Sequence, residues 1–325
     1  MIEARGLTKR YGAKVAVDDL SFEARPGVVT GFLGPNGAGK STTMRMIVGL
    51  DAPTRGSVMV GGHRYRDSPA PLTEIGVLLE ARSVHTGRSA RAHLLALAQT
   101  HGIGQRRVDE MLELVGLTEV GRKRVGSFSL GMGQRLGLAA AMLGDPAVLC
   151  LDEPVNGLDP EGIRWVRQLL RGLAAEGRTV FVSSHLMSEM AVTAEQLVVV
   201  GRGRVIAETS VAEFTAGAST GSVLVRSPQA ARLAEALRGQ DVNITPQGED
   251  ALIVSGSTAP AVGAAALAAG IVLHELTPQQ ASLEEAFMHL TADAVEYTGH
   301  TAGHASVPGP AQPDETAQAP VGGRQ

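Results

Sequence analysis

One glycine-rich segment restricts what this 325-residue chain can fold into more than any other feature. It runs Gly34-Pro35-Asn36-Gly37-Ala38-Gly39-Lys40-Ser41-Thr42 and fits the phosphate-loop pattern G-x-x-x-x-G-K-[ST]. An apolar run at 28–32 predicts a strand before it, and 42–50 predicts a helix after it. In such a loop, backbone N–H groups turn inward around phosphate oxygens at the positive end of the helix. We expect these nine residues to bind nucleotide phosphates, with Lys40 on the β- and γ-phosphates and Ser41 also on Mg²⁺.

Two acidic residues, Asp152 and Glu153, follow the apolar run 147–151. Taken alone, this pattern is also typical of a buried strand that ends in a solvated acidic turn. After a phosphate loop it favours a catalytic edge, because α/β sheets bind ligands at the carboxyl ends of their strands. We expect Asp152 to hold Mg²⁺, directly or through water, and Glu153 to orient or deprotonate the attacking water. A further apolar strand, 179–183, leads to His185, which we expect beside Glu153 and the γ-phosphate.

Residues 1–218 alternate expected strands, glycine-rich turns and helices, which predicts an α/β fold with a parallel sheet. A helical stretch at about 88–144 is too long for a single crossover between two strands. It therefore predicts a helical subdomain inserted into this phosphate-loop nucleotide-binding domain. The strands are expected at 28–32, 57–60, 74–79, 147–152, 179–183 and 197–200.

The sequence after residue 218 predicts a second, smaller domain and a tail. Residues 220–290 follow the order β-α-β-β-α-β-α, which predicts a small ferredoxin-like α+β domain. Its last strand is expected at 271–276, and a capping box starting at Ser282 predicts a last helix to residue 290. The segment 298–325 is rich in Pro, Gly and Ala, has little to bury and is expected to be disordered.

Composition excludes several classes of protein. Lys and Arg total 29 against 33 Asp and Glu, a formal charge of −4, which argues against a nucleic-acid partner. No apolar run reaches the length of a membrane span, so we expect none. The single cysteine, Cys150, excludes an internal disulfide framework and favours a reducing compartment.

The motifs occur in the order found in the ATP-binding subunits of ABC transporters, which residues 1–215 resemble. Tyr11 matches the aromatic residue that stacks on adenine in that family. Ser129 and Gly131 lie in Phe-Ser-Leu-Gly-Met, which is similar to the family's signature Leu-Ser-Gly-Gly-Gln but carries Leu130 and Met132 in place of Gly and Gln. This variant resembles the branch of antibiotic and lantibiotic resistance exporters (ABC-2 type).

The resemblance implies roles for further residues. Ser129 and Gly131 would reach the γ-phosphate across a dimer interface, and Asp159, in a turn shortly after Glu153, would contribute to the nucleotide site. Glu80 stands where the family has a glutamine that contacts Mg²⁺; a carboxylate keeps the metal contact and loses the NH₂ donor.

The resemblance also implies an activity and partners. It predicts an ATPase that uses ATP and Mg²⁺, forms a homodimer through ATP, and drives a separate membrane-spanning subunit from the cytoplasmic face of the membrane. The expected cargo of this exporter is a drug, an antibiotic or a lipid-like molecule. The alternative is a soluble ABC-type ATPase that acts on ribosomes or DNA. Such proteins normally carry two such domains or a long coiled coil, neither of which is seen in this sequence.

Overall fold

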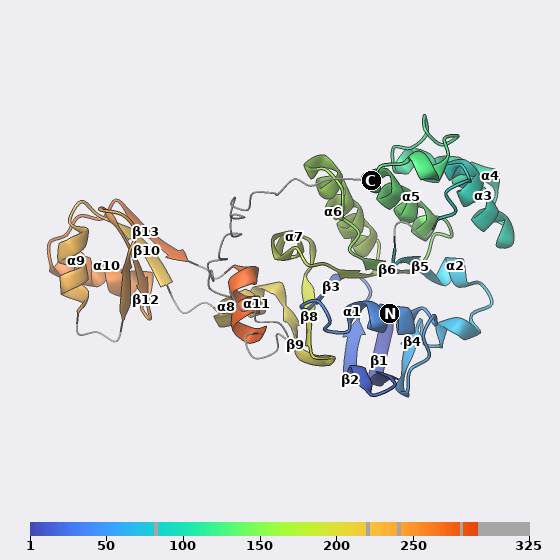
Figure 1. Ribbon diagram of the computed structural model, residues 1–325. Helices are drawn as coiled ribbons and strands as arrows, with labels where there is room; N and C mark the ends of the chain where they lie inside the picture. Colours follow the sequence, from blue (N-terminus) through green and yellow to red (C-terminus); the bar gives the residue numbers. More distant parts are fainter. Residues whose placement is uncertain (81–83, 219–221, 239–241, 280–281, 292–325) are drawn as a thin grey trace, which may run out of the picture. The chain divides into compact units, whose positions relative to one another are not determined.

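The computed structural model describes residues 1–80, 84–218, 222–238, 242–279 and 282–291 (Figure 1). The expected disordered tail at 298–325 lies outside these ranges. No helix in the described ranges is both long enough and apolar enough to span a bilayer.

A six-stranded sheet forms the centre of the nucleotide-binding part, in the order β5-β6-β7-β3-β8-β9. All neighbours pair in parallel except β8 and β9, which are antiparallel. The strands are β5 (Ile75–Leu78), β6 (Val148–Asp152), β7 (Thr179–Ser183), β3 (Val29–Leu33), β8 (Gln196–Gly201) and β9 (Arg204–Ser210). This sheet confirms the predicted α/β class.

Alternate residues of the central strands enter two different cores, because successive side chains of a strand point to opposite faces. In β6, Leu149 and Leu151 pack into the larger core with the helices, whereas Val148 and Cys150 pack on the other face. Both faces are therefore covered. This explains why these strands are continuous apolar runs in the sequence.

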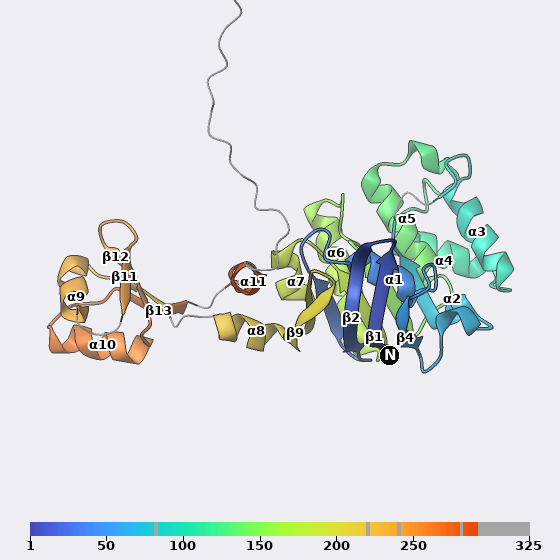
Figure 2. The ribbon, with the colours of Figure 1, turned by 60° about the horizontal axis from the view of Figure 1, so that its bottom comes forward.

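A second, three-stranded antiparallel sheet, β2-β1-β4, covers one face of the central sheet (Figure 2). Its strands are β1 (Ile2–Tyr11), β2 (Lys14–Ala24) and β4 (Arg55–Val60). Phe22 from β2 packs on Phe32 and Phe181, with ring centroids 5.6 and 5.2 Å away. Only β4 was expected from the sequence, since β1 and β2 mix polar and apolar residues on a half-exposed sheet.

Helices cover the other face. The stretch expected to be helical contains α3 (Ala90–Thr100), α4 (Gln105–Leu114) and α5 (Leu130–Met142). This part also contains α2 (Pro71–Glu74), α6 (Pro160–Ala175), α7 (Met187–Thr193) and α1 (Lys40–Ile47), whose buried residues pack on the face of the three-stranded sheet. Buried residues of α3, α4 and α5 share the larger core with α6 and with the strands.

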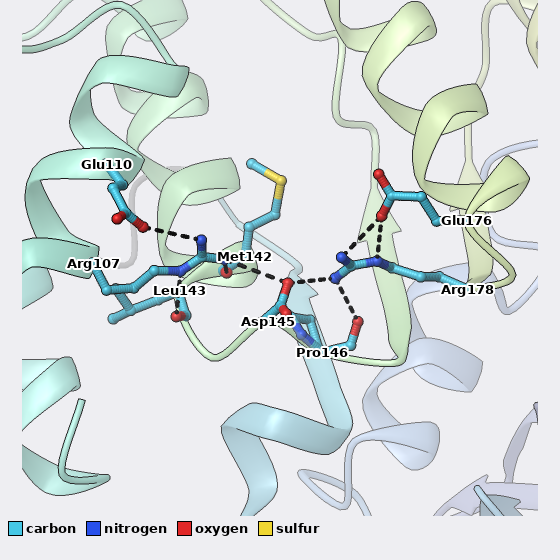
Figure 3. Close-up of polar contacts among 8 residues, drawn as sticks. All are labelled: Arg107, Glu110, Met142, Leu143, Asp145, Pro146, Glu176 and Arg178. Carbon is cyan, nitrogen blue, oxygen red and sulfur yellow. Dashed lines mark hydrogen bonds and ion pairs between the residues drawn. The ribbon is translucent and has the colours of Figure 1, made fainter. Parts of the chain in front are cut away.

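A polar cluster joins α4 to the far end of α5 and to the start of β7 (Figure 3). Arg107 on α4 donates to the carbonyls of Met142 (3.0 Å) and Leu143 (3.2 Å), which lie at the end of α5. Asp145 accepts from Arg178 (2.8 Å) and forms an ion pair with Arg107 (3.5 Å). The cluster satisfies carbonyls that a helix end leaves without partners inside the helix.

The small sheet has the order β11-β12-β10-β13, with every pair antiparallel. Its elements are β10 (Ser222–Arg226), α9 (Ala230–Leu237), β11 (Asn243–Pro246), β12 (Ala251–Ser255), α10 (Ala259–Ala268) and β13 (Glu275–Gln279). In chain order this is 2-3-1-4, the arrangement of a ferredoxin-like sheet. Its apolar residues form a core of their own.

The last strand of this sheet starts later than expected. The predicted strand at 271–276 was wrong in its first four residues, because Ile271 belongs to the end of α10. Its N–H donates to the carbonyl of Ala266 (2.9 Å) across Gly270, which has φ 64°, and its side chain is buried. This is a helix C-terminus closed by a left-handed glycine.

The C-terminal helix, α11 (Leu283–Thr291), does not pack with the small sheet. Its Leu283, Ala286 and Phe287 are buried in the larger core, and α11 contacts α7 and α8 (Val211–Ala218). The predicted capping box is present: Ser282 N–H donates to Glu285 Oε2 (2.8 Å), and Glu285 N–H donates to Ser282 Oγ (3.1 Å). Placing this helix in the small domain was therefore wrong, because its apolar face fits the nucleotide-binding part.

Candidate nucleotide-binding and catalytic site

The phosphate loop connects β3 to α1 and depends on glycine at two close approaches. A Cβ on Gly34 would lie 2.5 Å from the carbonyl oxygen of Val200. A Cβ on Gly39 would lie 2.6 Å from the carbonyl oxygen of Ala16, and Gly39 has φ 98° where α1 begins. Larger residues would push the loop off both neighbouring strands. The loop is thus held with the N-terminus of α1 open towards the cavity beside it.

Lys40 is a charged side chain that is only 8% exposed. Its Nζ donates to the carbonyls of Gly34 (2.5 Å) and Pro35 (3.3 Å), so the loop itself accepts its hydrogen bonds. Burial lowers the pKa of Lys40, and the negative charges of Glu153 and Asp152 oppose that shift. A phosphate would supply the opposite charge that this buried amine lacks at close range.

Asp152 ends β6 between two hydroxyl groups. Ser41 Oγ donates to its Oδ2 (2.9 Å), and Ser183 Oγ at the end of β7 donates to its Oδ1. These are hard oxygen donors next to a phosphate loop, the donor type that Mg²⁺ prefers. The residues present therefore fit a magnesium ion.

Glu153 and His185 form a pair beside Asp152. His185 Nδ1 lies 2.7 Å from Glu153 Oε2, and the backbone N–H of His185 donates to the same oxygen at 3.3 Å. Glu153 has φ 52°, a left-handed backbone that residues other than glycine rarely adopt. The pairing agrees with the register of β6 and β7, which places Ser183 opposite Asp152.

Most of the predicted residues meet in one cavity of about 630 Å³. The loop, the acidic strand end and His185 all line it, and so does the aromatic residue expected near adenine. The lining comprises Tyr11, Lys14, Ala16, Pro35, Asn36, Gly37, Gly39, Lys40, Ser41, Thr42, Asp152, Glu153, Asn156 and His185. Gly34 and Ala38 belong to the loop but do not line the cavity; a Cβ on Gly34 would lie 3.1 Å from the Ala38 Cβ. A cavity of about 660 Å³ between β2, β8 and β9 contains none of these motifs.

Tyr11 is 48% exposed and keeps its ring at the cavity. Its hydroxyl donates to Asp51 Oδ2 (2.9 Å), and Arg45 Nε donates to the same oxygen at 2.8 Å. Burial and the Asp51 carboxylate raise the pKa of Tyr11, while the hydrogen bond from Arg45 lowers the pKa of Asp51. Lys9 Nζ lies 4.9 Å from the centre of the ring, within the range of a cation–π contact.

The structure does not bring Ser129, Gly131, Asp159 or Glu80 to the lining of this cavity. Ser129 caps α5 by accepting from Met132 N–H (3.2 Å), and a Cβ on Gly131 would lie 2.8 Å from the carbonyl oxygen of Gly157. Asp159 caps α6 by accepting from Gly162 N–H (3.0 Å).

Glu80 was expected to hold Mg²⁺ in this site. It follows β5, which ends at Leu78, and it is exposed where the chain leaves the sheet next to β6.

Two residues that contact the catalytic edge were not predicted as site residues. Ser183 bonds to Asp152, and Gln134 on α5 donates to the main-chain carbonyl of Glu153 (2.8 Å). Both are buried polar side chains. The signal that could have identified Gln134 is its position just after Phe-Ser-Leu-Gly-Met, on the same helix.

A phosphate loop facing an acidic strand end across a single cavity defines a nucleotide-binding protein of the phosphate-loop class. The family described as "ABC transporter" matches residues 17–156, and a "Domain of unknown function (DUF8746)" matches residues 221–284. The chain is 36% identical over 303 residues to the uncharacterized ABC transporter ATP-binding protein YhcH of Bacillus subtilis (strain 168), covering 92% of this chain and 99% of the relative.

Other relatives are named for the transport of a compound or for resistance to one. The chain is 42% identical over 211 residues to the bacitracin transport ATP-binding protein BcrA of Bacillus licheniformis, covering 64% of this chain and 69% of the relative. It is 35% identical over 303 residues to the daunorubicin resistance ATP-binding protein DrrA3 of Streptomyces coeruleorubidus, covering 90% and 96%. A solved ATP-binding subunit of an ABC transporter superimposes with a TM-score of 0.62 at 27% identity, covering 67% and 92%.

The chain therefore belongs to the family of ABC transporter ATP-binding proteins. It is an ABC-type ATPase, and its relatives include the antibiotic resistance branch that the sequence resembled.

Proposed function

We propose that this chain hydrolyses Mg²⁺-ATP in the cavity around Lys40 and so powers the export of a drug, an antibiotic or a lipid-like molecule through a separate membrane-spanning subunit. One observation carries the proposal. The phosphate loop, the Ser41–Asp152 pair and the Glu153–His185 pair, which lie far apart in the sequence, line a single cavity.

The loop residues bind and orient the triphosphate. Backbone N–H groups of residues 36–42 surround the phosphate oxygens, and Lys40 exchanges its bonds to Gly34 and Pro35 for the β- and γ-phosphates. Ser41 and Asp152 would hold Mg²⁺, with Glu80 as a further candidate ligand. When bound, this ion neutralises phosphate charge. The exposed ring of Tyr11 stacks on adenine.

Glu153 acts as the general base. Its carboxylate accepts the proton of a water whose oxygen attacks the γ-phosphorus, while the bond to the β–γ bridging oxygen breaks and ADP and phosphate form. His185, 2.7 Å from that carboxylate, orients it and contacts the γ-phosphate.

The site is completed by a second copy of the chain. Ser129 and Gly131 lie at the N-terminus of α5, and Asp159 lies close by, since the Cβ position of Gly131 touches Gly157. These residues are outside the cavity of their own chain, so they are available to a nucleotide held by a partner. We therefore expect a head-to-tail homodimer that closes on ATP.

Relatives named for bacitracin transport and daunorubicin resistance support the cargo and the direction of transport. Export requires a membrane-spanning partner, and we place this chain at the cytoplasmic face of that subunit.

A transport assay with the purified complex tests the proposal. The chain is co-expressed with its membrane subunit, purified and placed in inside-out vesicles, with bacitracin and daunorubicin as probes. We expect ATP-dependent uptake of at least one probe that is lost in Glu153→Gln and kept in Glu161→Gln, a matched change on α6. Uptake that is equal with and without ATP, or equal in the two variants, would contradict the proposal.

A further inference from the structure

Gln134 is a polar side chain on α5 that is only 3% exposed. Its Nε2 donates to the main-chain carbonyl of Glu153 at 2.8 Å. This bond crosses from the helical segment to the end of β6. It reaches the backbone of the proposed base and does not involve the carboxylate, which pairs with His185.

We propose that Gln134 is a positioning residue that holds the backbone of Glu153 in the conformation that hydrolysis needs. The inference rests on the proposed role of Glu153 as the base. Gln134 itself does not line the nucleotide cavity, so it acts through Glu153 and not on the substrate.

Glu153 needs such support because its backbone is unusual. With φ 52° it lies in the left-handed region, which persists at a non-glycine residue only where neighbours enforce it. Its N–H donates to the carbonyl and the Oγ of Ser183, both at 3.2 Å. Its carbonyl accepts from Gln134 and from the N–H of Asn156 (3.2 Å).

These bonds divide into local and remote ones. The Asn156 bond closes a turn that starts at Glu153 itself, and the Ser183 bonds come from the adjacent strand. Gln134 is the contact from a helix of another part of the chain, and its bond is the shortest of the four. A change of the Glu153 backbone out of the left-handed region would turn this carbonyl away and move the carboxylate relative to His185, its partner at 2.7 Å.

The same helix carries Ser129 at its N-terminus, five positions before Gln134. At about 1.5 Å per residue, the two positions lie roughly 7.5 Å apart along the helix. One helix therefore carries both the proposed contact to a partner's nucleotide and the support of the chain's own base. The placement of Gln134 therefore ties the base to the helix that a second copy engages.

The first test replaces Gln134 with methionine, which keeps the length of the side chain and removes the donor. We expect kcat to fall about tenfold, while the affinity for ATP stays within twofold because the phosphate loop is untouched. The matched control is Arg107→Met, which removes side-chain bonds to carbonyls at the opposite end of α5 (Figure 3). This control is expected to lower the melting temperature and to leave kcat within twofold.

The second test is a double-mutant cycle in single-turnover hydrolysis. If Gln134 acts through Glu153, Gln134→Met costs about tenfold in the parent and less than twofold in Glu153→Gln. The same loss in both backgrounds would overturn the inference, and so would an unchanged kcat in Gln134→Met. If Glu153→Gln alone hydrolyses ATP at the parent rate, the proposed base is wrong, which is a different failure from that of Gln134.

Discussion

Lys40 shows at the level of a single residue how the fold prepares for a ligand. Its amine is buried beneath the phosphate loop, and loop carbonyls accept its hydrogen bonds. Burial lowers its pKa, so the fold disfavours the charged form that nucleotide binding uses. The nucleotide supplies the missing negative charge. Removing the amine should therefore weaken ATP binding without lowering the stability of the nucleotide-free protein.

Lys40→Met should weaken ATP binding by at least about tenfold, because a charge-assisted contact to phosphate is lost. In the absence of nucleotide, its melting temperature at pH 7 should equal or exceed that of the parent. The folded pKa is lowered, so the penalty on the charged amine is full below that pKa and fades as the pH rises towards the ordinary value of about 10.4. The stability advantage of the variant should shrink over that range.

Calorimetric ATP titration and thermal melts from pH 7 to 10.5 measure both effects. The control is Lys123→Met at an exposed lysine, which should change neither. A large drop in melting temperature for Lys40→Met without nucleotide would show that the buried amine stabilises the nucleotide-free protein, which contradicts this prediction.

Much of the candidate site follows from the sequence, since the carboxyl ends of parallel strands meet at one edge. That rule predicts that Lys40, Asp152, Glu153 and His185 lie together. It does not identify Gln134 or Asp51, because their contacts depend on how side chains from other elements pack against that edge. It also cannot place Glu80, which lies beyond the end of its strand.

At the level of elements, the continuous apolar strands were predicted and three half-exposed strands were missed. β1, β2 and β9 each carry polar side chains on an open face, so their composition does not separate them from loops. The position of α11 was also beyond the sequence. Its pattern shows an amphipathic helix, but a pattern cannot tell which of two cores will receive the apolar face.

Phe287→Ala should destabilise the nucleotide-binding part by about 3 kcal/mol, the cost of removing a buried aromatic side chain and leaving a cavity. Phe287 is 6% exposed and lies in the larger core with Phe214. The neighbouring Met288, 60% exposed, provides the control, and Met288→Ala should stay within about 0.5 kcal/mol. Urea unfolding of both variants measures the difference. Equal midpoints would show that α11 does not contribute to this core.

Across the whole molecule, the small sheet and the nucleotide-binding part have separate cores, and the chain returns to the nucleotide-binding part through α11. Replacing residues 220–281 with a Gly/Ser linker of about 12 residues should therefore leave ATP turnover within about twofold. Truncation after residue 218 also removes α11 and should cost stability as Phe287→Ala does. Loss of turnover in the linker variant alone would show that the small sheet takes part in hydrolysis.

The proposed dimer implies that association of two copies depends on nucleotide. If Ser129 of one copy completes the Lys40 site of another, the interface is held largely by shared ATP, and association should depend on nucleotide. A variant that binds ATP without hydrolysing it should then accumulate as a dimer.

The most direct measurement follows ATP binding, association state and single-turnover hydrolysis in Glu153→Gln, Glu80→Gln and the double variant. Glu153→Gln keeps the shape of the side chain and removes a negative charge beside the phosphates, so binding should be equal or tighter. Hydrolysis should fall by at least about tenfold, roughly 1.4 kcal/mol of barrier, and ATP should hold the chain as a dimer. Parent-rate hydrolysis in Glu153→Gln together with its loss in Glu80→Gln would contradict the assignment of Glu153 as the base.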